Sequence, residues 1–136
     1  MKILVDTSIW SAAMRRSSAT ETAETHELRR LINGFRATLI GPIRQEILSG
    51  IPNPKQYETL RALMTAFVDE PITSADYECA AHFFNRCRAK GVQGSHVDFL
   101  ICAVSVARSL PIFSIDKDFV GYAKYLPITL YKLKVA

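Results

Sequence analysis

Four acidic residues occupy positions at which carboxylates could bind a metal ion. Asp6 ends the strand-forming run of residues 2–5, and Asp116 directly follows another apolar run in IFSIDKDF. Glu46 lies in IRQEIL, after a second predicted strand, and Asp98 lies in GSHVDFLICAV, near the start of a strongly apolar helix. Carboxylates brought together repel one another unless they are protonated or neutralised by a cation. Because oxygen ligands select hard ions, the cation that we expect is Mg²⁺ or Mn²⁺.

Two of these acids also have a purely structural interpretation. Glu46 borders the helical face that contains Ile43 and Ile47, so we expect it to point partly inward, where an unpaired carboxylate is costly. The alternative is a glutamate that reaches back to solvent. Ser95 and Asp98 have the spacing of a capping box, and in that interpretation Asp98 stabilises only the start of its helix.

Asp116 also has a purely structural interpretation, and hydroxyl residues accompany both Asp116 and Asp6. Asp116 could be a turn residue that caps the next helix, although Asp118 is the better candidate for that cap. The hydroxyls of Thr7, Ser8 and Ser114 lie close to these acids in sequence, and we expect them to orient the acids or bound waters from a second layer around the metal.

Strands and helices alternate along the sequence. Strands are predicted at 2–5, 37–40, 70–72, 111–115 and 127–131. Helices are predicted at 7–16, 19–34, 57–68, 74–90 (capped by Ser74), 95–109 and 118–125, and a further helix begins at 41 and ends before a loop over 50–55. This order predicts an α/β sandwich around a mostly parallel sheet. Ligands of such sheets bind beyond the carboxyl ends of the strands, which is where Asp6 and Asp116 are expected.

The length and composition fit one intracellular domain. The 136 residues suffice for a single core, and no apolar run approaches the roughly 18 residues of a membrane span. The N-terminus lacks a signal-peptide pattern, so we expect a cytoplasmic protein with no membrane partner. Cys79, Cys87 and Cys102 have neither metal-ligand nor disulfide spacing, and we interpret them as buried thiols in a reducing compartment.

The chain is basic, with a formal net charge of +4 and a pI near 9.1. Basic residues cluster at Arg15, Arg16, Arg29, Arg30, Arg86, Arg88, Lys90, Lys132 and Lys134. Such clusters are compatible with a solvated surface. They also fit a polyanionic partner such as nucleic acid.

The order of DTSIW, IRQEIL and HVDFLICAVSVARSLPIFSIDKDF resembles the PIN-domain ribonucleases, and among them the VapC-type toxins of bacterial and archaeal toxin–antitoxin modules. The likeness covers the whole chain and implies a single PIN domain over 1–136, with an α/β/α sandwich. It implies that Asp6, Glu46, Asp98 and Asp116 are the catalytic, metal-binding acids. Ser114 takes the place of a frequent threonine, and Asp118 matches a commonly acidic position.

This resemblance implies an endoribonuclease that uses Mg²⁺ or Mn²⁺ to activate water and hydrolyse phosphodiester bonds, with tRNA or rRNA as the expected substrate. Candidate phosphate contacts are Arg15, Arg16, Arg86, Arg88 and Lys117. Trp10 could stack on a base or belong to the core. The resemblance also implies a homodimer that is inhibited by a cognate antitoxin.

Other classes of protein fit less well. A haloacid-dehalogenase-like phosphatase would have D-x-D after the first strand, but Ser8 occupies the second position. A receiver domain would have an early acidic pair and an acceptor aspartate after a middle strand. Two alternatives within the family stay open: a catalytically inactive RNA-binding or scaffolding module, and a nuclease that processes RNA outside a toxin–antitoxin system.

Clustered carboxylates also predict how a partner would bind. We expect an antitoxin tail to place an arginine or lysine beside Asp6 and Asp98. We also expect it to lay an apolar helix in a groove between the first two helices. The residues expected to form that groove are Ile9, Trp10, Met14, Leu28 and Leu31.

Overall fold

The computed structural model describes residues 1–15 and 21–133, which form a parallel sheet flanked by helices. The sheet has the strand order β2-β1-β3, with β1 at Ile3–Val5, β2 at Ala37–Thr38 and β3 at Ile112–Phe113. Leu4 of the central strand pairs in parallel with Thr38 on one side and Ile112 on the other. The predicted α/β sandwich with a mostly parallel sheet is confirmed.

The outer predicted strands are shorter than the sequence suggested. Single parallel bridges join Leu39 to Asp69 and Ile112 to Leu130, in place of strands over 70–72 and 127–131. Pro71 and Pro127 lack a backbone N–H and cannot donate to a ladder. The sheet is therefore extended by one bridge at each edge.

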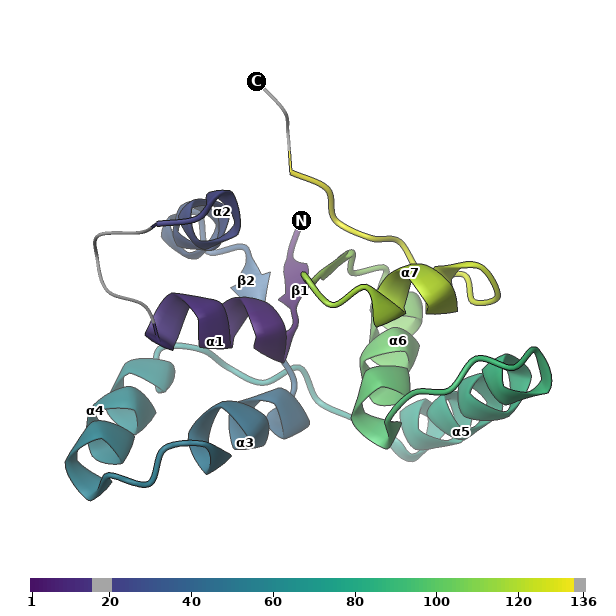
Figure 1. The fold of residues 1–136 in the computed structure, drawn as a ribbon, viewed down its shortest axis with the longest axis horizontal. Coiled ribbons are helices and arrows are strands. Elements are labelled where there is room, and N and C mark those ends of the chain that lie inside the picture. Colours follow the sequence, from purple (N-terminus) through teal and green to yellow (C-terminus); the bar gives the residue numbers. More distant parts are fainter. Residues whose placement is uncertain (16–20, 134–136) are drawn as a thin grey trace.

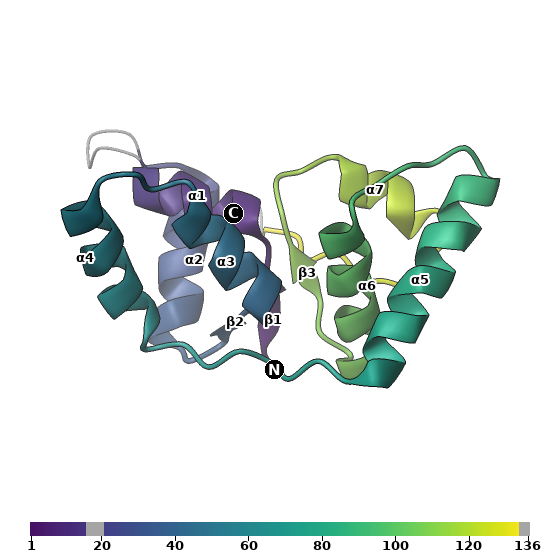
Figure 2. The same cartoon turned by 90° about the horizontal axis from the view of Figure 1, so that it is seen from below.

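Seven helices surround this sheet in the described residues. They are α1 (Thr7–Arg15), α2 (Ala23–Asn33), α3 (Gly41–Ser49), α4 (Pro54–Met64), α5 (Ser74–Ala89), α6 (His96–Arg108) and α7 (Asp118–Ala123). In both views, α1 to α4 lie on one side of β1, and α5 to α7 lie on the other (Figures 1 and 2). Arg16, and the predicted helical residues 19 and 20, lie outside the part of the chain that the structure describes.

Three helix starts differ from the prediction because of capping side chains. Helix α2, predicted from residue 19, begins at Ala23, because Thr22 accepts a hydrogen bond from the backbone N–H of Thr25. Asn53 accepts hydrogen bonds from the backbone of Lys55 and Gln56, so α4 begins at 54, within the predicted loop. The cap of α5 is Thr73 and not Ser74. Thr73 and Asp76 form a complete capping box, in which each side chain accepts from the backbone N–H of the other residue.

Helix α6 lies between β3 and α5 (Figure 2). Its residues 99–105 are all buried, as its continuous apolar sequence predicts. Cys87 and Cys102 are buried free thiols, and Cys79 is a half-buried one. Among the described residues, no helix is both long and apolar enough to cross a membrane.

Candidate active site

Asp6 lies at the carboxyl end of β1, where the backbone N–H of Asp6 still donates to Phe113 of β3. This pairing brings the ends of the two strands together. The Asp6 side chain is only 6% exposed, and its Oδ2 accepts hydrogen bonds from Ser8 Oγ at 2.8 Å and Ser114 Oγ at 2.7 Å. Two of the three predicted hydroxyls, those of Ser8 and Ser114, therefore contact the first acid directly, whereas that of Thr7 donates to Glu46.

Ser114 also connects Asp6 to the acids that follow β3. The backbone N–H of Asp116 donates to Ser114 Oγ at 2.9 Å, and the N–H of Asp118 donates to Asp116 Oδ1 at 2.9 Å. These turns bring Asp116 and Asp118 close to Asp98, and one carboxylate oxygen from each of the three lies within 4.8 Å of the other two. Asp118, expected only to support the ligands, belongs to the closest group of carboxylates.

Asp98 forms half of the predicted capping box. Its backbone N–H donates to Ser95 Oγ at 3.1 Å, while its side-chain Oδ2 accepts from the hydroxyl of Tyr122 at 2.6 Å. Burial raises the pKa of the Asp98 carboxyl; the hydrogen bonds from Tyr122 and Ser95 oppose that shift, and the negative charges of Asp6 and Asp116 add to it. The raised pKa means that the neighbours of Asp98 do not fully stabilise the charged form of its carboxyl.

Glu46 does not point inward as predicted. Ile43 and Ile47 take the buried face of α3, and the Glu46 side chain is exposed. Its Oε1 accepts a hydrogen bond from Thr7 Oγ1 at 2.7 Å, so it approaches the site from the solvent side beside Asp6. It lies apart from the close group formed by Asp98, Asp116 and Asp118.

No basic side chain neutralises these acids within the part of the chain that the structure describes. The ion pairs found there use other carboxylates: Glu21, Glu27, Glu58, Asp69, Glu70 and Asp76. The donors at the site are carboxylate oxygens supported by hydroxyls, which is the chemistry that Mg²⁺ and Mn²⁺ prefer. The residues present therefore fit a hard divalent cation.

The predicted nucleic-acid contacts separate into two groups. Arg86, Arg88 and Lys117 are exposed, and the guanidinium groups of Arg86 and Arg88 lie 5.6 Å and 5.9 Å from the ring centroids of Phe83 and Phe84. Trp10 is fully buried and donates from its indole to the carbonyl of Val5, so it is a core residue. The side chain of Arg15, and all of Arg16 and Lys134, lie outside the described residues.

Tyr122 is a site residue that sequence reasoning missed. Its phenol contacts a carboxylate 24 positions away in the chain. Burial raises the pKa of the phenol, and the Asp98 carboxylate raises it further, so the hydroxyl stays protonated and donates. An aromatic residue in the short helix after IDKDF carries no signal that its hydroxyl would turn towards α6.

A model of the PIN domain family matches residues 3–125. The chain belongs to the PIN domain family. No curated protein sequence matched the chain. The membership agrees with the resemblance carried by the acids and their neighbours.

Several solved structures share the PIN fold of this chain. FitAcB from Neisseria gonorrhoeae has a TM-score of 0.77 and 18% sequence identity, over 96% of each chain. VapBC2 from Rickettsia felis, bound to a DNA fragment from their promoter, has a TM-score of 0.73 and 14% identity, over 98% of this chain and 100% of that one. FitAB bound to an IR36 DNA fragment has a TM-score of 0.75 and 17% identity, over 98% of both chains.

Proposed function

We propose that this PIN domain is a divalent-metal-dependent endoribonuclease that acts as the toxin of a toxin–antitoxin module. The observation that carries the proposal is the group of acids at the end of the sheet that no described basic side chain neutralises. The other two buried acids of the described residues are each paired with an arginine: Glu27 with Arg30 at 2.7 Å and Asp76 with Arg108 at 2.9 Å. A PIN domain with this unpaired set has the donors that metal-dependent hydrolysis requires.

Each acid has a proposed role. Asp6, Asp98 and Asp116 would hold the cation, with Asp118 of the same close group beside them. Glu46, predicted as a fourth ligand, lies further out on the solvent side, where Thr7 contacts it. When bound, Mg²⁺ or Mn²⁺ would lower the pKa of water and offset negative charge on the phosphodiester. Ser8 and Ser114 hold the Asp6 carboxylate through its Oδ2.

A proton acceptor and a binding surface complete the proposed site. Thr7 holds Glu46 through Oε1, and we assign Oε2 of the same side chain as the acceptor of the proton that the attacking water releases. The exposed Arg86, Arg88 and Lys117 would contact phosphates of the RNA, for which tRNA and rRNA are the proposed sources.

Cleavage of labelled RNA in the presence and absence of metal tests the proposal. Single-stranded and hairpin RNAs should be cut in Mg²⁺ or Mn²⁺, EDTA should stop the reaction, and added metal should restore it. Equal cleavage in excess EDTA would show that the metal mechanism is wrong. RNA binding without cleavage would instead support the inactive RNA-binding module, and cleavage by a protein that does not slow growth would support RNA processing outside a toxin–antitoxin system.

The proposed antitoxin groove needs a correction. Ile9, Trp10, Leu28 and Leu31 are at most 2% exposed, so they pack in the core and cannot form a groove. A surface groove of about 620 Å³ lies instead beside α4. Its lining residues are Met14, Ile51, Lys55, Gln56, Thr59, Leu60 and Leu63.

We propose that the apolar part of an antitoxin tail occupies this α4 groove, and that a basic residue of the tail lies beside Asp6 and Asp98. Two of the similar structures, VapBC2 bound to a promoter DNA fragment and FitAB bound to an IR36 DNA fragment, support a partner of this kind for the present chain. Co-expression with the neighbouring gene should relieve growth inhibition. If a tail without its basic residue inhibits RNA cleavage equally well, only the groove contributes.

Sedimentation of the purified chain would test the proposed homodimer.

A further inference from the structure

The side chain of Tyr122 connects the apolar core to the acidic site. Its ring is fully buried, with the ring centroid of Phe99 at 4.9 Å and that of Phe119 at 5.3 Å. Only the hydroxyl reaches a polar partner, Oδ2 of Asp98, at 2.6 Å. Because the ring is enclosed by aromatic neighbours, the hydroxyl has little freedom to move away from this oxygen.

Gly94, in the loop before α6, makes this position of Tyr122 sterically accessible. A Cβ atom built at Gly94 would lie 2.2 Å from the Tyr122 hydroxyl oxygen and 2.7 Å from its Cζ. Such distances are far inside van der Waals contact, so any other residue at 94 would displace the phenol. The requirement is steric, because among the described glycines only Gly91 has a positive φ.

We propose that Tyr122 is a positioning residue for the metal site, and that Gly94 provides the space in which it acts. By holding Oδ2, the phenol fixes the orientation in which the Asp98 carboxylate lies beside Asp116 and Asp118. A carboxylate held in one orientation binds a cation without first losing rotational freedom, and hydrogen bonds of this kind tune the ligands of metal sites. The inference rests on the proposed metal-dependent function.

The first test compares two Tyr→Phe variants by Mn²⁺ binding, measured by titration calorimetry on the whole chain. Tyr122→Phe removes one hydroxyl and keeps the ring, and we expect it to weaken Mn²⁺ binding about tenfold. Tyr125 lies three residues further on and has no side-chain hydrogen bond among the described residues, so Tyr125→Phe should bind Mn²⁺ like the wild type. Mn²⁺ affinity of Tyr122→Phe within twofold of wild type would overturn the proposal.

The second test moves the phenol without removing it. Gly94→Ala should weaken Mn²⁺ binding as Tyr122→Phe does, although every hydrogen-bonding group is retained. Gly50→Ala is the matched control, because a Cβ at Gly50 would meet no atom within 4 Å. Thermal unfolding in EDTA checks that each variant is folded at the temperature of the titration. Wild-type affinity in a folded Gly94→Ala variant would show that Gly94 has no such role.

A double variant separates positioning from a general effect on stability. If Tyr122 acts through Asp98, then Tyr122→Phe should weaken Mn²⁺ binding no further in an Asp98→Asn background. An equal further loss in that background would show that Tyr122 acts elsewhere. Absence of Mn²⁺ binding and RNA cleavage in the wild type would reject the proposed function itself, whereas normal binding in Tyr122→Phe would reject only the role of Tyr122.

Discussion

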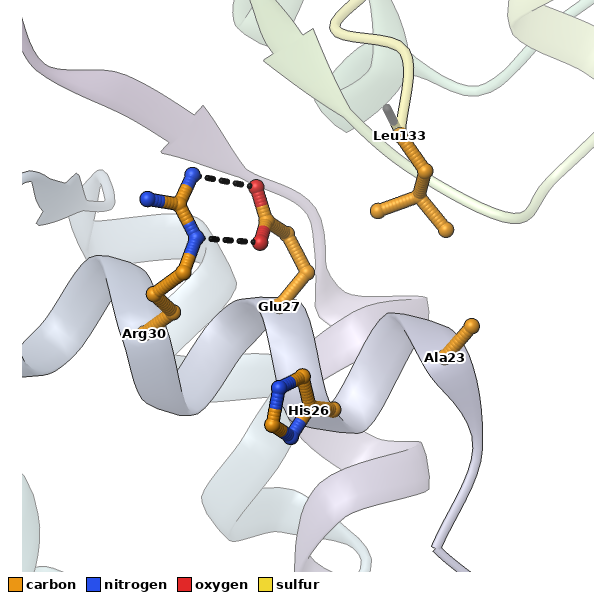
Figure 3. Close-up of a pocket in the computed structure, with 5 residues that line it drawn as sticks. All are labelled: Ala23, His26, Glu27, Arg30 and Leu133. Atoms are coloured by element: carbon orange, nitrogen blue, oxygen red, sulfur yellow. Dashed lines mark hydrogen bonds and ion pairs between the residues drawn. The ribbon is translucent and has the colours of Figure 1, made fainter. Parts of the chain in front are cut away.

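Among the described residues, Glu27 and Asp98 each accept a hydrogen bond from a tyrosine, yet their environments shift the pKa of the two carboxyls in opposite directions. Glu27 of α2 accepts a hydrogen bond from Tyr131. Arg30 donates to both Glu27 oxygens, at 2.7 Å and 2.9 Å (Figure 3). The Arg30 hydrogen bonds, more than any other contact, lower the pKa of Glu27 to about 2. Asp98 also accepts from a tyrosine, but no arginine of the described residues pairs with it, and burial raises its pKa.

The difference distinguishes a structural acid from one that awaits a cation. Glu27 is 8% exposed, and its charge is neutralised within the fold, beside a pocket of about 300 Å³ between α2 and the C-terminal segment. The acids around Asp98 have hydroxyl and backbone donors but no positive partner among the described residues. A hydrogen bond from a neutral donor orients a carboxylate, whereas a nearby full positive charge compensates it. The Asp98 site therefore has a net negative charge, which a bound metal ion would neutralise.

The largest expected effect comes from removing one charge of the unpaired group. Asp6→Asn keeps the volume of the side chain, and we expect RNA cleavage to fall more than 100-fold, since even outer partners of metal ligands contribute about 10–100-fold. Glu78→Gln, an exposed acid of α5, should cleave at the wild-type rate. Thermal unfolding of both variants checks the fold. An active Asp6→Asn variant would mean that the unpaired acids are not the metal site.

The paired group should respond in stability and not in cleavage. Glu27→Gln leaves Arg30 and Tyr131 without their shared carboxylate, and we expect the free energy of unfolding in urea to fall by about 1–2 kcal/mol. The loss is limited to this size because the Arg30 side chain is about half exposed, and solvent screens the ion pair. The control is Glu58→Gln. Glu58 has the same two-point contact with Arg61 on an exposed face, so its loss should leave stability unchanged within error. Equal losses in both variants would show that burial of Glu27 adds nothing.

Most of the unpaired group could be predicted from the sequence, whereas the pairing of Glu27 with Arg30 was not predicted. Apolar runs followed by acids placed Asp6 correctly at the end of β1, and Asp116 follows β3 after two intervening residues, because β3 ends at Phe113 and not at 115. A parallel sheet brings the carboxyl ends of its strands together. Asp98 was found because it interrupts the most apolar helix. Periodicity tells which face of a helix is buried but not what covers it, and for that reason Trp10 and Leu28 were assigned to a groove.

Contacts between distant segments were beyond the sequence pattern. The side chain of Glu46 sits at the border of an apolar face, where a small rotation of the helix decides between inside and outside. The hydrogen bond of Tyr122 to Asp98 depends on the packing of α7 against α6 and on the space beside Gly94. Neither the outward orientation of Glu46 nor the hydrogen bond of Tyr122 leaves a local signature in composition or spacing.

The pH dependence of stability sharpens the comparison further. The pKa of Glu27 is lowered from 4.5 to about 2 in the folded chain, so its ionised form stabilises the fold. This contribution is complete above pH 4.5 and is lost as the pH falls from 4.5 through 2. The stability difference between wild type and Glu27→Gln, measured by urea unfolding, should therefore be constant above pH 4.5 and shrink below it. A difference that persists unchanged at pH 2 would show that the charge of Glu27 is not its cause.

The smallest expected effect is a gain in stability at the unpaired group. In EDTA, Asp98 faces the charges of Asp6 and Asp116, and Asp98→Asn removes that repulsion while its backbone N–H can still donate to Ser95. We expect the free energy of unfolding to rise by about 0.5–1 kcal/mol. Mn²⁺ should reverse the order, because a ligand that binds only the folded state stabilises the wild type by mass action. Urea unfolding of both proteins, in EDTA and in Mn²⁺, measures the two differences. A large loss of stability in EDTA would instead mean that Asp98 serves mainly as a capping residue of α6, and the contrast with Glu27 would then disappear.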